Sequence, residues 1–130
     1  MSDTSSASLA GRGLQQVGLF CRDTSRAKDF YANVLGLPFL FETAGMLFFQ
    51  LKDMRLMIGK TQSPEQPVGG GIVYFDAPDI DTLGPALEAR GVKFHGPAIA
   101  LQEMPAHVLK LRSFNDPDGN ALALMGLVPK

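Results

Sequence analysis

Two cationic side chains two positions apart, Lys110 and Arg112, are the residues of this sequence best suited to holding a ligand. In an extended strand they lie on one face. Two cations in a partly apolar hollow are costly unless they meet water, a carboxylate or an anionic ligand. Because a planar guanidinium suits acidic and carbonyl groups, we expect Arg112, with Lys110, to clamp such a group of a small organic molecule. The alternative is that both reach solvent or pair with Glu42 or Glu103.

The positions of the other reactive side chains in the sequence indicate structural rather than chemical roles. Cys21 falls on the apolar side of an alternating strand, which favours burial over a nucleophilic role, and a lone cysteine fits a reducing cytoplasm. His107 lies in an expected connection between strands, where a lone histidine is more often a surface or hydrogen-bonded residue than a metal ligand. Asp116 and Asp118 are interpreted as turn formers rather than as an acid/base pair.

Composition excludes several classes of protein. The chain has 130 residues, of which 45% are hydrophobic and 19% charged, with a formal net charge of −1. This length suits one compact domain or two small fused modules. Nucleic-acid binding is not expected, because it needs a clustered excess of Lys and Arg. No apolar run approaches the roughly 18 residues of a membrane helix, and residues 1–13 lack a secretory signal and are expected to form a flexible tail.

Hydrophobic periodicity and turn residues predict the same run of elements twice. Residues 14–60 should form a β-α-β-β-β module, residues 61–68 a linker, and residues 69–130 a second module. Strands and helices are expected at residues 14–21, 24–35, 38–43, 46–51 and 54–60, and then at 71–77, 79–90 and from 92. Inside the second helix Pro85 would lose a hydrogen bond and clash with the preceding turn. We therefore expect residues 79–83 to form a separate turn and the helix to begin at Pro85.

The segment FNDPDGN at residues 114–120 predicts a tight turn between the last two strands. Pairing Asn115 with Asn120 would set Arg112 opposite Ala123. In this register one face carries Leu111, Leu122 and Leu124, and the other carries Lys110, Arg112, Ala121, Ala123 and Met125. A strand pair with leucines on one face and small or cationic residues on the other is typical of one wall of a cavity, with the second face toward the cavity.

A second tight turn, Lys52-Asp53, sets the register of the first module. Pairing residue 51 with residue 54 places Phe48 opposite Met57, and Gln50 opposite Arg55, on one face.

Side chains on the same side of these strands are expected to line the pocket. Phe20, Phe48, Met57 and Met125 would form its apolar part, with core packing as the alternative. Gln16 would hydrogen-bond either a ligand carbonyl or a neighbouring backbone group.

The repeated module and the DPDGN turn together carry a resemblance. The matching residues are Gln16-Val17-Gly18-Leu19, Phe30-Tyr31, Val34-Leu35-Gly36-Leu37, Leu87-Glu88-Ala89-Arg90-Gly91-Val92, Phe114 and Asp116-Pro117-Asp118-Gly119-Asn120. In this order and spacing they resemble the glyoxalase, bleomycin-resistance and extradiol-dioxygenase group, the vicinal oxygen chelate superfamily. The resemblance implies an α+β fold in which two tandem modules curl their mixed sheets into one cup with helices outside. It also implies a homodimer.

Enzymes of that superfamily hold a divalent metal with four side chains, two from each module. The resemblance places these positions at Gln16, Met57, Gly71 (or Ile72) and Ala123. Only Gln16 offers a suitable donor, because hard and borderline cations need several oxygen or imidazole ligands. Neither a metal nor another cofactor is therefore expected.

The sequence thus favours a metal-free, cytoplasmic protein of the bleomycin-resistance type that sequesters or carries a small molecule. Its expected ligand-binding residues are Gln16, Phe20, Phe48, Met57, Lys110, Arg112, Ala123 and Met125. One alternative is a lyase, isomerase or dioxygenase with an unconventional metal site, or with metal-free acid/base chemistry by His107, Glu103 or Tyr74. Another is a dimeric interaction module.

Overall fold

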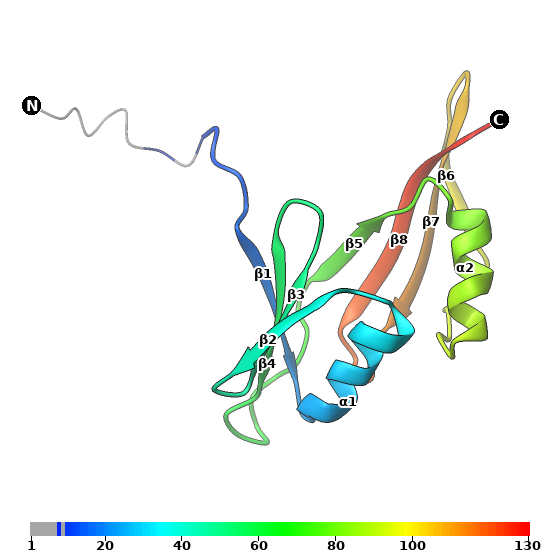
Figure 1. Ribbon diagram of the computed structural model, residues 1–130. Coiled ribbons are helices and arrows are strands. Elements are labelled where there is room, and N and C mark those ends of the chain that lie inside the picture. Colours follow the sequence, from blue (N-terminus) through cyan, green and yellow to red (C-terminus); the bar gives the residue numbers. More distant parts are fainter. Residues whose placement is uncertain (1–7, 9) are drawn as a thin grey trace, which may run out of the picture.

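The computed structural model describes residue 8 and residues 10–130, so most of the expected tail lies outside the described residues. Two modules follow one another (Figure 1). The first contains β1 (Gln16–Cys21), α1 (Thr24–Asp29), the wider helical turn η2 (Phe30–Val34), β2 (Phe39–Thr43), β3 (Met46–Gln50) and β4 (Arg55–Lys60). The second contains β5 (Ile72–Asp76), α2 (Ile80–Ala89), β6 (Ile99–Glu103), β7 (His107–Asn115) and β8 (Ala121–Pro129).

Each module forms a four-stranded mixed sheet, in the order β1-β4-β3-β2 and β5-β8-β7-β6. In both sheets the first strand runs parallel to the last, and the remaining neighbours are antiparallel. The identical order and direction of strands show that the chain is an α+β tandem repeat, as the sequence predicts.

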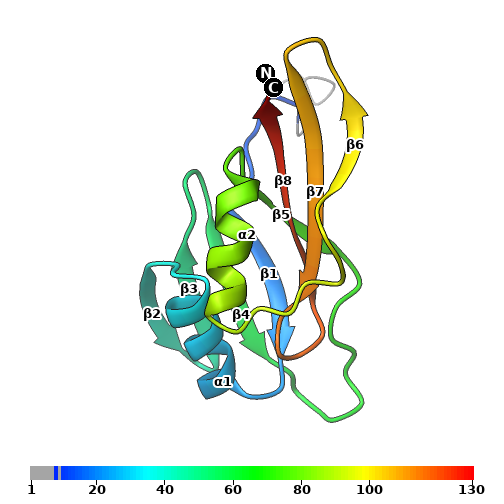
Figure 2. The ribbon, with the colours of Figure 1, turned by 90° about the vertical axis from the view of Figure 1, so that its right-hand side faces the viewer.

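Both helices cover the same side of the strands, and they lie in front of the sheets in Figure 2. Alternation along each strand sends one set of side chains to this helix side. The core there includes Leu47, Phe49, Leu56 and Ile58 of the first module, all fully buried, and Phe114, Leu122 and Leu124 of the second. Burying each such side chain stabilises the fold by about 1.5–3 kcal/mol. No helix of the described residues is long and apolar enough to cross a membrane.

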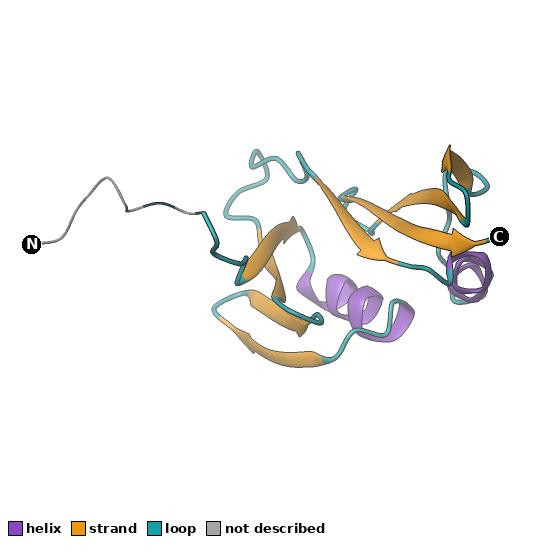
Figure 3. Ribbon diagram, turned by 90° about the horizontal axis from the view of Figure 1, so that it is seen from above, coloured by secondary structure: helices purple, strands orange, loops and turns teal. Residues whose placement is uncertain are grey.

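The opposite side of each sheet carries no helix, and we call it the open face. By strand pairing its side chains include Gln16, Phe20, Phe41, Phe48, Arg55 and Met57 in the first module and Ile72, Tyr74, Asp76, Ala123, Met125 and Leu127 in the second. Several are large and exposed, such as Phe20 at 41% and Tyr74 at 51%. From above, α1 lies in the angle between the two sheets (Figure 3). The open face of each module is thus on the far side of its sheet from α1 and α2.

The first helical segment begins where the sequence predicts, and it ends one residue early, because α1 continues as η2 to Val34 rather than as a helix to residue 35. The carboxylate of Asp23 accepts a hydrogen bond from the backbone N–H of Arg26 at 3.1 Å, which caps the helix N-terminus. Gly36 adopts a left-handed φ of 76°, and the N–H of Leu37 donates to the carbonyl of Tyr31. This glycine turn releases the chain into β2.

The second helix differs from the prediction at Pro85. It runs without a break from Ile80 to Ala89, with the proline inside it. Ile80 and Leu87, on either side of the proline, are both buried against the sheet. Packing of this continuous apolar face holds the helix together although Pro85 cannot donate a backbone hydrogen bond.

The strand expected from residue 92 is also absent. Phe94 makes only an isolated bridge to Phe114, and the next strand begins at Ile99. The rings of the two phenylalanines meet edge to face, with centroids 5.2 Å apart. This segment is therefore held by its side chains rather than by a ladder of backbone hydrogen bonds.

The predicted register of the last hairpin is wrong by one residue. Asn115 pairs with Ala121, not with Asn120, and Arg112 pairs with Leu124, not with Ala123. The reason is that Asp116 and Asn120 close the turn through a backbone bond of 3.0 Å, leaving a three-residue loop that ends in Gly119 at φ 89°. A shift of one residue moves every side chain of a strand to its other face.

A close backbone approach ties β8 to the segment that leads into α2. A Cβ atom built at Gly126 would overlap the carbonyl group of Ala77. The N–H of Ala77 donates to the carbonyl of Met125 at 2.8 Å in the same place. The chain can cross β8 here only because residue 126 has no side chain.

We therefore expect Gly126→Ala to lower the free energy of unfolding by about 3 kcal/mol or more, because backbone atoms must move to admit the methyl group. Urea unfolding followed by circular dichroism measures this change. Gly71→Ala is the matched control, since a Cβ at Gly71 meets no atom within 4 Å. Equal stability of the two variants would contradict the tight crossing.

Candidate functional site

Arg112 does not lie on the open face, which corrects the sequence prediction. Its Nε donates to the carbonyl of Gly96 at 2.9 Å, and its Nη1 lies 3.2 Å from a carboxylate oxygen of Glu88 in α2. The guanidinium also stacks on the ring of Phe94, 4.0 Å from the centroid. A Cβ at Gly84 would lie 2.7 Å from Nη1, so this glycine makes room for the cation against the helix. Arg112 joins α2 to β7.

Lys110 also lies on the helix side of the sheet, because the one-residue register shift turns both cations to that side. Its Nζ contacts both carboxylate oxygens of Asp81 in α2, at 2.9 and 3.0 Å. Neither cation pairs with Glu42 or Glu103, and Glu103 instead pairs with Lys130 at 2.9 Å. The one-residue register shift thus removes the predicted clamp from the open face.

The first module assembles its part of the predicted site. Phe48 lies opposite Met57 as the Lys52-Asp53 turn predicts. The Met57 side chain lies across two glycines, since Cβ atoms built at Gly18 and Gly59 would be 3.2 Å from its Cε and 3.3 Å from its Sδ. This thioether fills the middle of the open face.

Aromatic rings flank that methionine. Phe41 stacks on Phe48 with centroids 4.5 Å apart and an angle of 22° between the rings. Phe20 lies on the other side of Met57, because its ring approaches the Cβ position of Gly59 at 3.9 Å. The result is an apolar surface with exposed aromatic groups at both ends.

The second module places Ala123 and Met125 on its open face, in register with Tyr74 and Asp76. Ile72 pairs with Ala121 as Gln16 pairs with Arg55 in the first module. By this internal match Ile72, rather than Gly71, is the counterpart of Gln16.

Hollows follow the seam between the two sheets. One of about 220 Å³ is lined by Phe20 on the first module and by Ile72 and Asn120 on the second. Another, of about 730 Å³, lies between the turn at residues 51–54 and the strand that carries Ile72 and Tyr74. Residues of both open faces therefore border accessible space near the edges of β1 and β5.

The positively charged residue that does lie on the open face is Arg55, which was not among the predicted site residues. Its Cζ lies 5.3 Å from the centroid of Phe48. The signal was present in the sequence, because the correct first-module register already puts Arg55 on the same face as Phe48 and Met57.

The groups named for metal-free acid/base chemistry share no side-chain hydrogen bond among the described residues, although Glu103 and His107 flank the same tight turn, in which the Met104 N–H donates to the His107 carbonyl at 2.8 Å. Tyr74 lies on β5 and Glu103 on β6, at opposite edges of the same sheet. His107 is the first residue of β7, not part of the preceding connection, and it pairs with Pro129.

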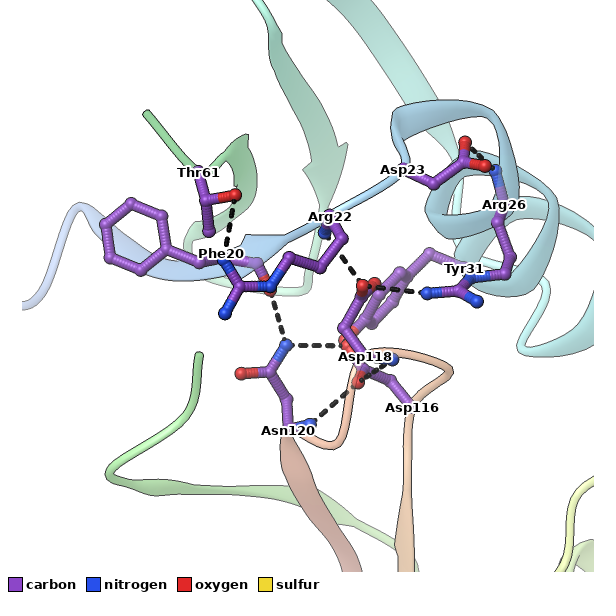
Figure 4. Close-up of polar contacts among 9 residues, drawn as sticks. All are labelled: Phe20, Arg22, Asp23, Arg26, Tyr31, Thr61, Asp116, Asp118 and Asn120. Carbon is purple, nitrogen blue, oxygen red and sulfur yellow. Dashed lines mark hydrogen bonds and ion pairs between the residues drawn. The ribbon is translucent and has the colours of Figure 1, made fainter. Parts of the chain in front are cut away.

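A buried carboxylate joins the two modules (Figure 4). Asp116 accepts from the Tyr31 hydroxyl of η2 at 2.8 Å, from the Asn120 amide at 2.8 Å, and from the backbone N–H groups of Asp118 and Asn120. The Asn120 amide also donates to the carbonyl of Phe20 on β1 at 2.7 Å. The turn of the second module is thereby fixed against the first.

We call this contact of Asp116 and Asn120 with Tyr31 and Phe20 the joint between modules. Asp118 adds an ionic contact to it. Its Oδ1 accepts from the backbone N–H of Arg22 at 2.7 Å and from the guanidinium of Arg26 at 2.9 Å (Figure 4). Asp116 and Asp118 are turn formers as expected, and they are also contacts between modules that sequence periodicity gives no means of finding.

Burial and the nearby carboxylates act on two ionisable groups beside the joint. Burial, followed by Asp118 and Asp116, raises the pKa of the Cys21 thiol to about 11. Burial and then the charge and hydrogen bond of Asp116 raise the pKa of Tyr31 far above its usual range. Cys21 is fully buried, in agreement with its predicted structural role.

The chain matches a known protein family over most of its length. Residues 13–124 match the family described as Glyoxalase/Bleomycin resistance protein/Dioxygenase superfamily. The chain belongs to this superfamily. A search of curated proteins found no match.

Solved structures of the superfamily resemble the chain over most of its length. A glyoxalase/bleomycin resistance protein/dioxygenase from Nocardioides is 21% identical with a TM-score of 0.72, covering 96% of this chain and 89% of its own. Lactoylglutathione lyase from Agrobacterium tumefaciens is 20% identical with a TM-score of 0.72, covering 88% and 93%. TnmS3, an antibiotic binding protein from Streptomyces sp. CB03234, is 26% identical with a TM-score of 0.71, covering 93% and 98%.

The four positions that the resemblance assigns to metal ligands do not suit a metal in this chain. They carry an amide at Gln16, a thioether at Met57, and alkyl groups at Ile72 and Ala123. Three of these four side chains offer no oxygen or imidazole donor for a hard or borderline cation. Within residues 8 and 10–130, no three His, Cys, Asp or Glu side chains gather closely enough to hold an ion.

The joint between modules predicts a loss of stability at alkaline pH. Groups whose pKa is raised by folding stabilise the protein below their unfolded pKa, and this contribution is lost as pH rises through the folded pKa. We expect the free energy of unfolding to fall from about pH 9, where Cys21 begins to contribute, and more steeply above about pH 10, where Tyr31 also contributes, by up to about 1.4 kcal/mol per pH unit for each group. Urea titrations from pH 7 to 11 measure it.

Tyr31→Phe isolates one of these groups. It should lower the free energy of unfolding at pH 7 by about 1.5–3 kcal/mol, because it removes a hydrogen bond to a buried carboxylate. It should also make the alkaline decline shallower. Tyr74→Phe, at the exposed second tyrosine, should leave the stability at pH 7 unchanged. An unchanged alkaline slope in Tyr31→Phe would contradict the assigned role of Tyr31.

Proposed function

We propose that this chain is a metal-free small-molecule-binding protein that sequesters or carries a small organic ligand bearing an acidic or carbonyl group. The ligand lies on the open face, against Gln16, Phe20, Phe48 and Met57 of the first module. Ala123 and Met125 line the corresponding part of the second module. The proposal places the protein in the cytoplasm, where the single thiol of Cys21 stays reduced.

The observation that carries this proposal is the position of Met57. Its thioether packs over Gly18 and Gly59 at the centre of the first-module open face, at a position that the resemblance assigns to a metal ligand. A polarizable, flexible side chain at this point suits contact with an apolar ligand. It does not suit coordination of a hard cation.

The likeness to TnmS3 supports the same function. That protein is described as antibiotic binding, and it covers almost the whole chain at 26% identity. A scaffold can host many chemistries, so the likeness supports the proposal only together with the side chains of the open face. Those side chains are apolar and aromatic, as ligand pockets generally are.

The exposed apolar side chains also support a homodimer. Ile72, Ile99 and Leu127 are each about half exposed, at 53%, 56% and 45%. Such side chains gathered on one sheet face are typical of a surface that another molecule covers. The two open faces of one chain point away from its helices, so a second copy would close the ligand space between chains.

A thermal-shift screen of small organic acids and ketones tests the binding function. We expect ligands that raise the melting temperature of the wild type, and we expect Met57→Asp to abolish these shifts because it places a charge among apolar groups. Arg112→Ala should lower stability but keep the shifts, since Arg112 lies on the helix side.

Metal content is measured on the same samples. Protein purified without chelator should contain far less than one Zn, Ni, Mn or Fe per chain, and EDTA should not change its melting temperature. A stoichiometric metal that disappears in Gln16→Ala would overturn the metal-free proposal in favour of an enzyme. Flat shifts across the library, without metal, would instead favour a dimeric interaction module.

Sedimentation equilibrium tests the dimer. The wild type should have twice the 14.0 kDa chain mass, and Leu127→Glu should be monomeric because a carboxylate cannot be buried unpaired. Leu14→Glu is the control, since Leu14 is 68% exposed and precedes the first strand. A monomeric wild type at every concentration would rule out closure by a second copy.

A further inference from the structure

Arg55 is a half-buried residue whose guanidinium lacks a counter-charge among the described residues. Elsewhere in the described chain, buried or half-buried cations meet carboxylates, as Arg112 meets Glu88 at 3.2 Å and Lys110 meets Asp81 at 2.9 Å. No carboxylate of the described residues lies within ion-pair distance of Arg55. A partly desolvated cation in this state is costly unless an anion or water completes its surroundings.

The surroundings of Arg55 are flat and aromatic. Its Cζ lies 5.3 Å from the Phe48 centroid, and Phe48 stacks on Phe41. Phe48 is 8% exposed, whereas Phe41 is 43% exposed. An accessible ring, Phe41 on β2, and a cation without a carboxylate partner, Arg55 on β4, therefore lie on either side of Phe48 on the first-module sheet.

The second-module open face has the opposite charge. Its strand cations, Lys110 and Arg112, are held by α2 on the helix side. Asp76 is exposed on the open face, in register with Met125. An anionic group on a ligand is thus attracted by the first module and repelled by the second.

Building on the proposed function, we propose that the ligand is a planar aromatic anion bound by the first module. Its ring stacks against Phe41 and the neighbouring apolar side chains, and its carboxylate or phenolate accepts hydrogen bonds from the guanidinium of Arg55. Offset stacking of rings and charge-assisted bonds from arginine each favour this chemistry. A neutral aromatic or an aliphatic acid satisfies only half of the site.

Three probes separate the ring from the charge: anthracene-2-carboxylate, anthracene-2-carboxamide and decanoate. Isothermal titration calorimetry on the full chain should give a Kd for the aromatic carboxylate about tenfold or more below that for the carboxamide. The aromatic carboxylate should also bind more tightly than decanoate. This preference of the wild type is the primary result expected.

Arg55→Met should remove the preference, raising the Kd of the carboxylate about tenfold and changing that of the carboxamide by less than about twofold. Lys93→Met is the matched control, because Lys93 is an exposed cation outside the strands, and it should keep the preference. Arg55→Lys should restore only part of it, since an ammonium lacks the planar fork. Phe41→Leu should weaken both anthracene probes alike.

Circular dichroism and melting temperature verify that each variant is folded, and Arg55→Gln replaces Arg55→Met if the latter is not. Equal affinity of the two anthracene probes, with both weakened by Met57→Asp, would overturn the aromatic-anion proposal but leave open-face binding intact. A preference that survives in Arg55→Met would also overturn it. If no probe binds while other compounds of the thermal-shift library do, the ligand class is wrong and the proposed function stands.

Discussion

The buried carboxylate of Asp116 is the interaction on which the arrangement of this chain depends. It collects donors from the Tyr31 hydroxyl, the Asn120 amide and two backbone N–H groups, so its charge is stabilised without exposure to water. Because Tyr31 belongs to the first module and the turn to the second, one side chain both shapes a hairpin and orients two sheets. Asp116 itself is fully used, although Oδ1 of Asn120 and Oδ2 of Asp118 in the same network are buried without a partner among the described residues. Buried networks of this kind hold their members in fixed positions, and the turn residues are therefore also the contact residues between modules.

The same turn explains where sequence reasoning succeeded and where it did not. The first-module register was predictable because Lys52-Asp53 leaves no choice of closing pair, and Phe48 indeed faces Met57. In the last hairpin, either Asn115 or Asp116 could close against Asn120. The choice depends on a backbone bond and a left-handed Gly119, which alternation of apolar residues does not reveal. The element order, the tandem repeat and the burial of Cys21 were insensitive to this choice, whereas the faces of Lys110 and Arg112 depended on it entirely.

Packing also overrode local propensity at Pro85. The helix continues through the proline because Ile80 and Leu87 share one buried face, and tertiary contacts commonly outweigh a single unfavourable residue. Gly84, next to it, has a second role that no helix propensity predicts, since it leaves space for the guanidinium of Arg112. A cation assigned to a ligand by its chemistry is thus a structural residue. Arg55 is the half-buried cation that has no carboxylate partner among the described residues.

The packing of Met57 has a consequence for how this scaffold can evolve. Its side chain occupies the space between Gly18 and Gly59, so a metal site at this point would require removal of a packed group as well as the introduction of donors at Ile72 and Ala123. Each intermediate sequence would bury a polar group without a metal to compensate it, which costs stability. Metal chemistry at these positions would thus need several simultaneous substitutions, whereas a change in the apolar side chains of the open face needs only one.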